Sequence, residues 1–202
     1  MEFVKEFAMF LYENGAIKFG DFKLSSGKES PYYIDLRLVP SFPHQFRKMI
    51  KILQNLISEK IGFDNFDCIA SVPTSGLVIA SALAIEIVKP LIYIRQKPKE
   101  YGTENVVEGK IVKGTRILLV DDVATTGLSL LNAIKLLKNT GVVVTDAFTI
   151  INRFEGAREA LAAENVRLYE ITDVMTLATT LHKENLIDNQ ILERVKKQIG
   201  LI

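Results

Sequence analysis

The sequence predicts an α/β fold, with helices covering both faces of a doubly wound, mostly parallel β-sheet. Two patterns indicate it: short, continuous apolar runs typical of strands buried on both faces, and longer segments with apolar residues at helical spacing between them. Such alternation argues for a parallel sheet. The expected strands are Cys68 to Val72, Leu91 to Ile94, Arg116 to Val120, Val142 to Ile151 and Arg167 to Ile171.

Before the alternation begins, the chain carries an appendage of about 40 residues. Residues 1–15 mix charged and apolar residues at helical spacing, which predicts an amphipathic helix rather than a signal peptide. Phe19 to Ile34 follows as short strands broken by Ser25, Ser26 and Gly27. The chain of 202 residues is expected to form one domain, with the core sheet over residues 41–175.

Helices are expected between the strands of the core. Their apolar residues recur every three or four positions, as in a helix that packs on a sheet. Gly141 is a plausible stop after the third of them. The expected helices are Phe42 to Ile61, Gly76 to Val88, Leu128 to Asn139, and one around Ala157 to Ala163.

Composition makes several classes of function less favoured, although local clusters of charge remain possible. With 25 basic and 24 acidic residues, the net charge of +1 gives no global field favouring nucleic acid or an anionic membrane. No apolar run approaches bilayer-spanning length. Cys68 is the single cysteine and fits a buried strand position in a reducing cytoplasm. His44 and His182 have no partner at metal-ligand spacing and are expected to be ordinary surface or packing residues.

The most informative segment is residues 117–129, ILLVDDVATTGLS. Asp121 and Asp122 come at the carboxyl end of an apolar strand, where open α/β sheets bind ligands, and vicinal carboxylates there can accept hydrogen bonds from ribose hydroxyls. Thr125, Thr126 and Gly127 then supply hydroxyls and backbone N–H groups at the start of a helix, which favours a phosphate. The segment resembles the phosphoribosyl pyrophosphate (PRPP) motif of the type I phosphoribosyltransferase family.

A second loop, SVPTSG at residues 71–76, also joins a strand to a helix at the same edge of the sheet. Thr74, Ser75 and Gly76 can turn backbone N–H groups toward an anion, although Pro-Thr-Ser-Gly is also an ordinary turn. In the family that the chain resembles, this position is the pyrophosphate loop.

Residues 94–109 form a long connection with clustered cations, either a solvated surface loop or a lid over an anion. It resembles the catalytic loop of the orotate phosphoribosyltransferase family, Arg-Lys-x-x-Lys-x-His-Gly, which Arg95, Lys99 and Gly102 match. Gln96 replaces the usual lysine and Tyr101 the usual histidine. The second replacement removes an imidazole, although a phenol can still hydrogen-bond to a pyrophosphate oxygen.

Two further features point to the base. Residues 22–37 resemble the hood of the same family, although a surface hairpin would carry the same pattern. Arg153 follows the strand that ends at Ile151 and has a guanidinium suited to gripping a carboxylate, which orotate carries and purine bases lack. By pattern alone, an arginine at a strand end is more often a surface residue.

The resemblance implies a role for each matching residue. Those implied in PRPP binding are Thr74, Ser75, Arg95, Gln96, Lys99, Tyr101, Asp121, Asp122, Val123, Ala124, Thr125, Thr126, Gly127, Leu128 and Ser129; those implied in orotate binding are Ser25, Tyr33, Ile34, Thr125 and Arg153. Of these, Asp121, Asp122, Lys99 and Arg95 are implied in catalysis.

The resemblance therefore implies a type I phosphoribosyltransferase fold with a hood, mainly residues 1–40, and transfer of the phosphoribosyl group of PRPP to orotate in pyrimidine synthesis. It also implies Mg²⁺, held mainly by substrate oxygens and water with no protein ligand assigned, and a homodimer that shares residues 94–109 between subunits. A purine phosphoribosyltransferase and a PRPP-sensing, nucleic-acid-binding regulator remain the alternatives.

Overall fold

The computed structural model describes residues 2–23, 27, 29–95 and 106–201. These fall into two compact units, one made of residues 1–46 and 172–202 and the other of residues 47–171. The division of the chain into a hood over residues 1–40 and a core over residues 41–175 stays a prediction.

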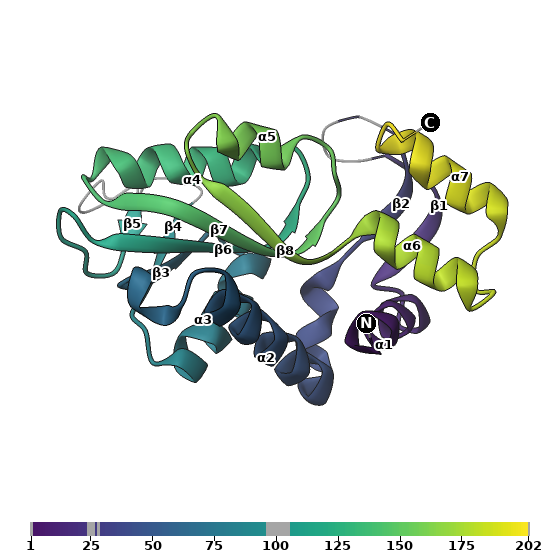
Figure 1. Cartoon of the computed structure of the whole chain (residues 1–202), viewed down its shortest axis with the longest axis horizontal. Helices are drawn as coiled ribbons and strands as arrows, with labels where there is room; N and C mark the ends of the chain where they lie inside the picture. Colours follow the sequence, from purple (N-terminus) through teal and green to yellow (C-terminus); the bar gives the residue numbers. More distant parts are fainter. Residues whose placement is uncertain (1, 24–26, 28, 96–105, 202) are drawn as a thin grey trace. The chain divides into compact units, whose positions relative to one another are not determined.

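The larger unit is built on a six-stranded sheet in the order β5-β4-β3-β6-β7-β8 (Figure 1). The strands β3, β4, β6 and β7 run parallel, and the two-residue β5 pairs antiparallel with β4. The predicted doubly wound, mostly parallel sheet is confirmed. The strands are β3 (Cys68–Ser71), β4 (Leu91–Ile94), β5 (Val107–Glu108), β6 (Arg116–Ala124), β7 (Val143–Asn152) and β8 (Arg167–Asp173).

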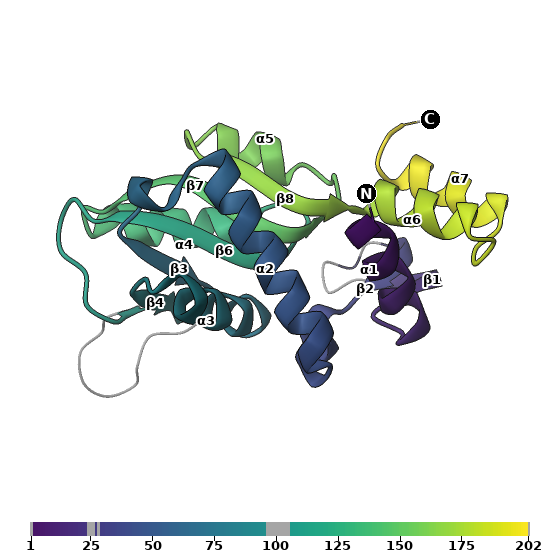
Figure 2. The ribbon, with the colours of Figure 1, turned by 60° about the horizontal axis from the view of Figure 1, so that its bottom comes forward.

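Helices cover both faces of this sheet. In Figures 1 and 2, α4 (Leu128–Asn139) and α5 (Ala157–Ala162) lie on one face, and α3 (Ser75–Ile87) lies on the other with most of α2 (Pro43–Lys60). A 3-10 turn, η2 (Phe63–Asn65), links α2 to β3. The helix α4 shows why the sequence folds this way, because Leu130, Ile134 and Leu137 are buried at helical spacing.

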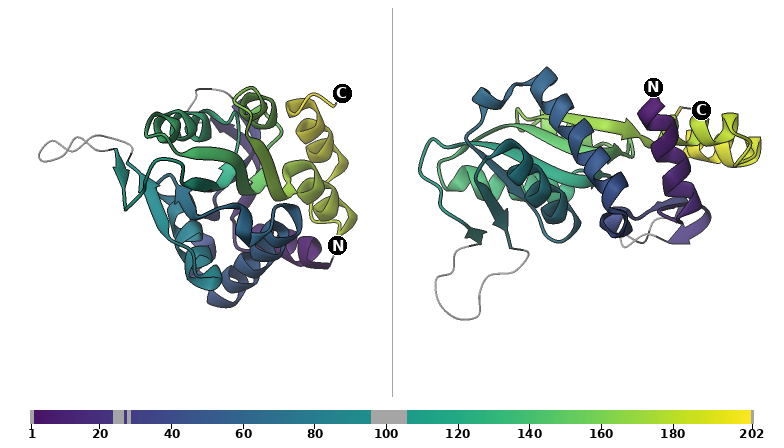
Figure 3. Two further views of the ribbon diagram at one scale, coloured as in Figure 1. Left: turned by 60° about the vertical axis from the view of Figure 1, so that its left-hand side comes forward. Right: turned by 90° about the horizontal axis from the view of Figure 1, so that it is seen from below.

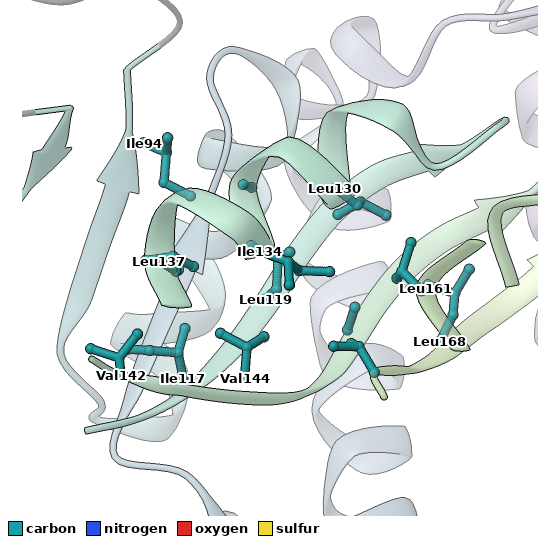
Figure 4. Packing of buried hydrophobic residues seen from close by; sticks show 14 of the residues in the cluster. Ile94, Ile117, Leu119, Leu130, Ile134, Leu137, Val142, Val144, Leu161 and Leu168 are labelled. Atoms are coloured by element: carbon teal, nitrogen blue, oxygen red, sulfur yellow. The ribbon is translucent and has the colours of Figure 1, made fainter. Parts of the chain in front are cut away.

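The core beneath α4 and α5 is apolar. Figure 4 shows Leu130, Ile134 and Leu137 of α4 beside Leu119 of β6 and Leu161 of α5. All five side chains are almost wholly buried. This packing fixes both helices against one face of the sheet. The helices begin just after the turns that follow β6 and β7.

The smaller unit combines the two ends of the chain. It contains α1 (Glu2–Glu13), the antiparallel pair β1 (Ile17–Lys23) and β2 (Glu29–Ile34), the 3-10 turn η1 (Leu36–Ser41), and two C-terminal helices, α6 (Val174–Lys183) and α7 (Asn189–Gln198) (Figure 3). A salt bridge of 2.7 Å joins Lys5 of α1 to Glu184 at the end of α6. Arg194 of α7 forms another with Asp21 of β1. The N-terminal appendage thus contacts residues from the far end of the sequence.

Most predicted elements match the structure closely, with three differences. The strand β6 continues through Asp121 and Asp122 to Ala124, because it pairs with β7 as far as Ala124 and Asn152. The short β5 lies inside the segment that was expected to be wholly a connection. The helices α6 and α7 follow the last predicted strand, where no element was expected. No helix in the described part of the chain is long and apolar enough to cross a membrane.

Candidate active site

Two carboxylates stand side by side near the carboxyl end of β6. Asp121 is 9% exposed, and its Oδ1 accepts a hydrogen bond of 2.9 Å from the backbone N–H of Asp122, which is itself half-buried. Burial, followed by the neighbouring charge of Asp122, raises the pKa of the Asp121 carboxyl well above its usual range. The pair therefore consists of a buried carboxyl, Asp121, and a half-buried one, Asp122, which is more accessible to a polar ligand.

The turn after β6 leads into α4 through Gly127. This residue has φ of 79°, in the left-handed region that glycine adopts without strain, and it is the N-cap of α4. A Cβ here would lie 3.0 Å from the Cα of Ala157 and from Cδ1 of Leu161. Thr126, Leu128 and Ser129 around it are exposed. The first turn of α4 thus meets the requirements for an anion site at a helix N-terminus.

The loop after β3 reaches the same place from the neighbouring strand. Ser71 pairs with Val120 of β6, and its hydroxyl donates a hydrogen bond of 2.7 Å to the Val120 carbonyl. At the start of α3, a Cβ on Gly76 would collide with the Asp121 carboxylate and lie 2.8 Å from Oγ of Ser71. The structure therefore brings together the two predicted loops, with the backbone of α3 directly against Asp121.

Arg153 follows β7, the next strand of the sheet. Its backbone N–H donates to the carbonyl of Ala124 at 2.9 Å, so the turn after β7 lies beside the turn after β6. The guanidinium is buried rather than on the surface, with the side chain 7% exposed. It is paired with Glu155, whose Oε1 lies 2.7 Å from Nη2 and 2.9 Å from Nε. Sequence reasoning missed Glu155.

Arg95 lies just past the end of β4 and is also paired with an acid. Its Nη1 donates to Oε1 of Glu108 in β5 at 3.1 Å, with the two side chains 34% and 26% exposed. Sequence reasoning missed Glu108 as well, because the pairing of β4 with β5 that brings it to Arg95 was not predicted.

Six predicted site residues fall outside the described part of the larger unit. Ser25, Gln96, Lys99 and Tyr101 lie outside the described residues, and Tyr33 and Ile34 belong to β2 of the smaller unit. The Tyr33 hydroxyl accepts a hydrogen bond of 3.1 Å from Arg37. Within the described ranges, no cluster of three or more His, Cys, Asp or Glu residues could hold a metal ion.

Comparison with known proteins identifies the family to which this site belongs. Residues 42–182 match the model of the phosphoribosyl transferase domain. The orotate phosphoribosyltransferase of Cenarchaeum symbiosum is 50% identical over 97% of this chain and 98% of its own, and that of Staphylothermus marinus is 40% identical over 98% and 95%.

Solved structures agree. The crystal structure of orotate phosphoribosyltransferase from Aeropyrum pernix has a TM-score of 0.75 and 37% identity, covering 90% of this chain and 99% of that one. Leishmania donovani UMP synthase has a TM-score of 0.85 and 30% identity, covering 98% of this chain and 42% of that longer one. From full-length identity and shared fold together, this chain belongs to the orotate phosphoribosyltransferase family.

Proposed function

We propose that the protein transfers the 5-phosphoribosyl group of PRPP to N1 of orotate, giving orotidine 5′-monophosphate and pyrophosphate. The observation that carries the proposal is the arrangement at one sheet edge: the paired carboxylates of β6, the loop at residues 71–76 and the buried guanidinium of Arg153 lie at the carboxyl ends of three adjacent strands. The relatives named above carry the same activity in their names.

In this mechanism the donor binds along the turn after β6. The 5′-phosphate of PRPP rests on residues 125–129 at the first turn of α4, where the helix dipole and backbone N–H groups favour an anion. Asp121 and Asp122 accept hydrogen bonds from the ribose hydroxyls. As the bond from C1 to pyrophosphate breaks, these carboxylates favour the positive charge that develops on the ribose. Preorganised groups of this kind are worth about 3 kcal/mol each in other enzymes.

Binding of the pyrophosphate leaving group requires positive charge. Pyrophosphate would be bound by the loop at residues 71–76 together with Arg95 and, from the resemblance, Lys99. The described site carries the carboxylates of Asp121 and Asp122 beside arginines that already have acidic partners, so positive charge is needed to bind a polyanion. Mg²⁺ fits this need, held mainly by PRPP oxygens and water, with half-buried Asp122 the carboxylate more open to its hydration shell.

The acceptor is proposed to bind at Arg153. Its burial supports a ligand role, because a guanidinium out of water binds a carboxylate more strongly than one at the surface. Orotate has such a carboxylate, whereas hypoxanthine and adenine have none, so Arg153 favours orotate over the purine alternative. Orotate arrives already ionised, so no strong general base is required. Ser25, Tyr33, Ile34 and Thr125 remain predicted contacts of the base.

The proposal includes a two-fold homodimer in the cytoplasm, with residues 94–109 of each subunit reaching the other's site. The surface of α3 supports an interface. This helix is apolar on all sides, yet Val78 in its first turn, Ile85 in its last turn and Val88 just after its end are 41%, 80% and 86% exposed. If sites are shared, mixing Lys99→Ala and Asp122→Ala subunits should restore part of the activity, and no restoration would refute sharing.

One spectrophotometric assay tests the central claim. Loss of orotate is followed after addition of PRPP with and without Mg²⁺, with hypoxanthine and adenine as competing bases. We expect orotate to be consumed only when PRPP and Mg²⁺ are both present. Turnover of a purine instead would favour the purine enzyme, and absence of any turnover would favour a PRPP-binding regulator.

A further inference from the structure

The ion pair between Arg153 and Glu155 is the most deeply buried one in the described part of the site. The two side chains are 7% and 9% exposed. Removing two charges from water is costly unless their contacts are good, so a buried pair is weak support for stability alone. Its place beside the proposed base site suggests instead that it holds the guanidinium in one orientation.

The contact geometry explains how. A guanidinium is planar and has five N–H groups in fixed directions. A single oxygen of Glu155 accepts from both Nε and Nη2, at 2.9 and 2.7 Å. Two contacts on one edge fix both the position and the plane of the group, and therefore the direction of the other edge, formed by Nη1 and Nη2.

The backbone on either side of Arg153 is fixed as well. The N–H of Arg153 is bound to the Ala124 carbonyl at 2.9 Å, and the N–H of Phe154 to Oδ1 of buried Asn152 at 2.9 Å. Phe154 has φ of 55°, an uncommon conformation for a side chain of its size. Glu155 therefore belongs to a turn whose backbone is held by hydrogen bonds, and the length of its side chain determines the position of the Arg153 guanidinium.

We infer that Glu155 is a positioning residue that aligns the Arg153 guanidinium with the carboxylate of the acceptor base. The inference rests on the proposed function, because it assigns Arg153 to orotate. It predicts the sign of the effect: without the Glu155 carboxylate, orotate binds less well. If Glu155 merely competed with orotate for the guanidinium, its removal would strengthen orotate binding.

The test uses Glu155→Gln, which keeps the size and one acceptor oxygen, and Glu155→Asp, which keeps the charge but shortens the reach. Glu159→Gln is the matched control, because Glu159 is an exposed acid in the first turn of α5. Melting temperatures establish that each variant is folded. We expect Glu155→Gln to raise the KM for orotate by about tenfold or more, since a misplacement of about 1 Å can cost up to a hundredfold. The KM for PRPP should stay within about twofold, and Glu159→Gln should behave as the parent protein.

A double-mutant cycle completes the test. In an Arg153→Met background, Glu155→Gln should change the KM for orotate by less than about twofold, because its effect passes through the guanidinium. A lower KM for orotate in Glu155→Gln, an unchanged one, or an equal rise for both substrates would each overturn the inference. Failure of the proposed function is distinguishable, because the parent protein would then not consume orotate at all.

Discussion

Replacing Gly76 by alanine is the most direct test of how closely α3 approaches the β6 carboxylates. The new Cβ would collide with Oδ1 of Asp121, lie 2.8 Å from Oγ of Ser71 and 3.1 Å from Cα of Asp121. None of these neighbours moves freely. Oγ of Ser71 is held to the Val120 carbonyl, and Oδ1 of Asp121 accepts from the N–H of Asp122.

The cost can be worked from these contacts. Overpacking a rigid site costs about 1–3 kcal/mol, and loss of the Asp121 hydrogen bond adds about 0.5–1.5 kcal/mol. Alanine recovers at most about 1 kcal/mol through its higher helix propensity. With the full alanine gain subtracted, the net destabilisation is about 0.5–3.5 kcal/mol, which for a protein of this size lowers the melting temperature by roughly 1–14 °C.

Activity should fall further than stability, because the displaced group is the carboxylate proposed to contact the ribose. We expect kcat/KM for PRPP to drop at least about tenfold, which corresponds to about 1.4 kcal/mol of lost transition-state stabilisation. Calorimetry and steady-state kinetics measure the two effects. Ser81→Ala is the control, since it raises the helix propensity of α3 without adding an atom near Asp121. Melting and kcat/KM of Gly76→Ala equal to those of the parent protein would refute the reasoning.

Three further predictions follow from the charges of the site. Because the folded pKa of Asp121 is raised, the unfolded chain binds fewer protons between about pH 3.9 and that raised value, and stability falls as pH rises through this window. Asp121→Asn should therefore melt above the parent protein at pH 7 and lose that advantage below about pH 4, and thermal scans against pH that show the reverse trend would contradict the burial argument. Arg153→Ala should raise the KM for orotate about 10- to 100-fold, through loss of charged hydrogen bonds worth about 1.5–3 kcal/mol, and an equal rise in the KM for PRPP would count against a base-binding role. Glu108→Gln frees Arg95 from a partly exposed pair worth at most about 1 kcal/mol. The KM for PRPP should then fall by no more than about fivefold at low salt, and a rise would mean that Glu108 supports Arg95 rather than competing for it.

The sequence predicts the parallel part of the sheet well because each parallel strand contains a short apolar run that is recognisable without its neighbours. The run at β3 is buried at every residue, β4 alternates half-buried and buried residues, and the bounds predicted for α4 match the structure. The local sequence pattern does not predict where a strand ends when pairing with the neighbouring strand determines that end. Asp121 and Asp122 are poor strand formers, yet they extend β6 because β7 lies beside them, with Asp121 opposite Thr149.

The candidate site likewise combines features that the local sequence predicts with contacts that it does not predict. The loops that carry Thr74 and Gly127 can be read from their strand-turn-helix context, whereas the acids paired with the two arginines cannot. Glu155 is two residues from Arg153, a spacing that gives no contact on a helix, and meets it in a turn with a left-handed residue at Phe154. Glu108 is thirteen positions from Arg95 and depends on the pairing of β4 with β5.

The contact of Gly127 with Ala157 has a consequence for engineering. The turn proposed to hold the sugar phosphate and the first residue of α5 are so close that a Cβ on Gly127 would press on the backbone of Ala157. The loop bearing Arg153 ends at that same residue. Exchanging residues 152–157 for those of a relative that uses another base would therefore also move the donor turn. A transplant that alters the preferred base while leaving sugar binding intact should include residues 124–128 and α5 as one block.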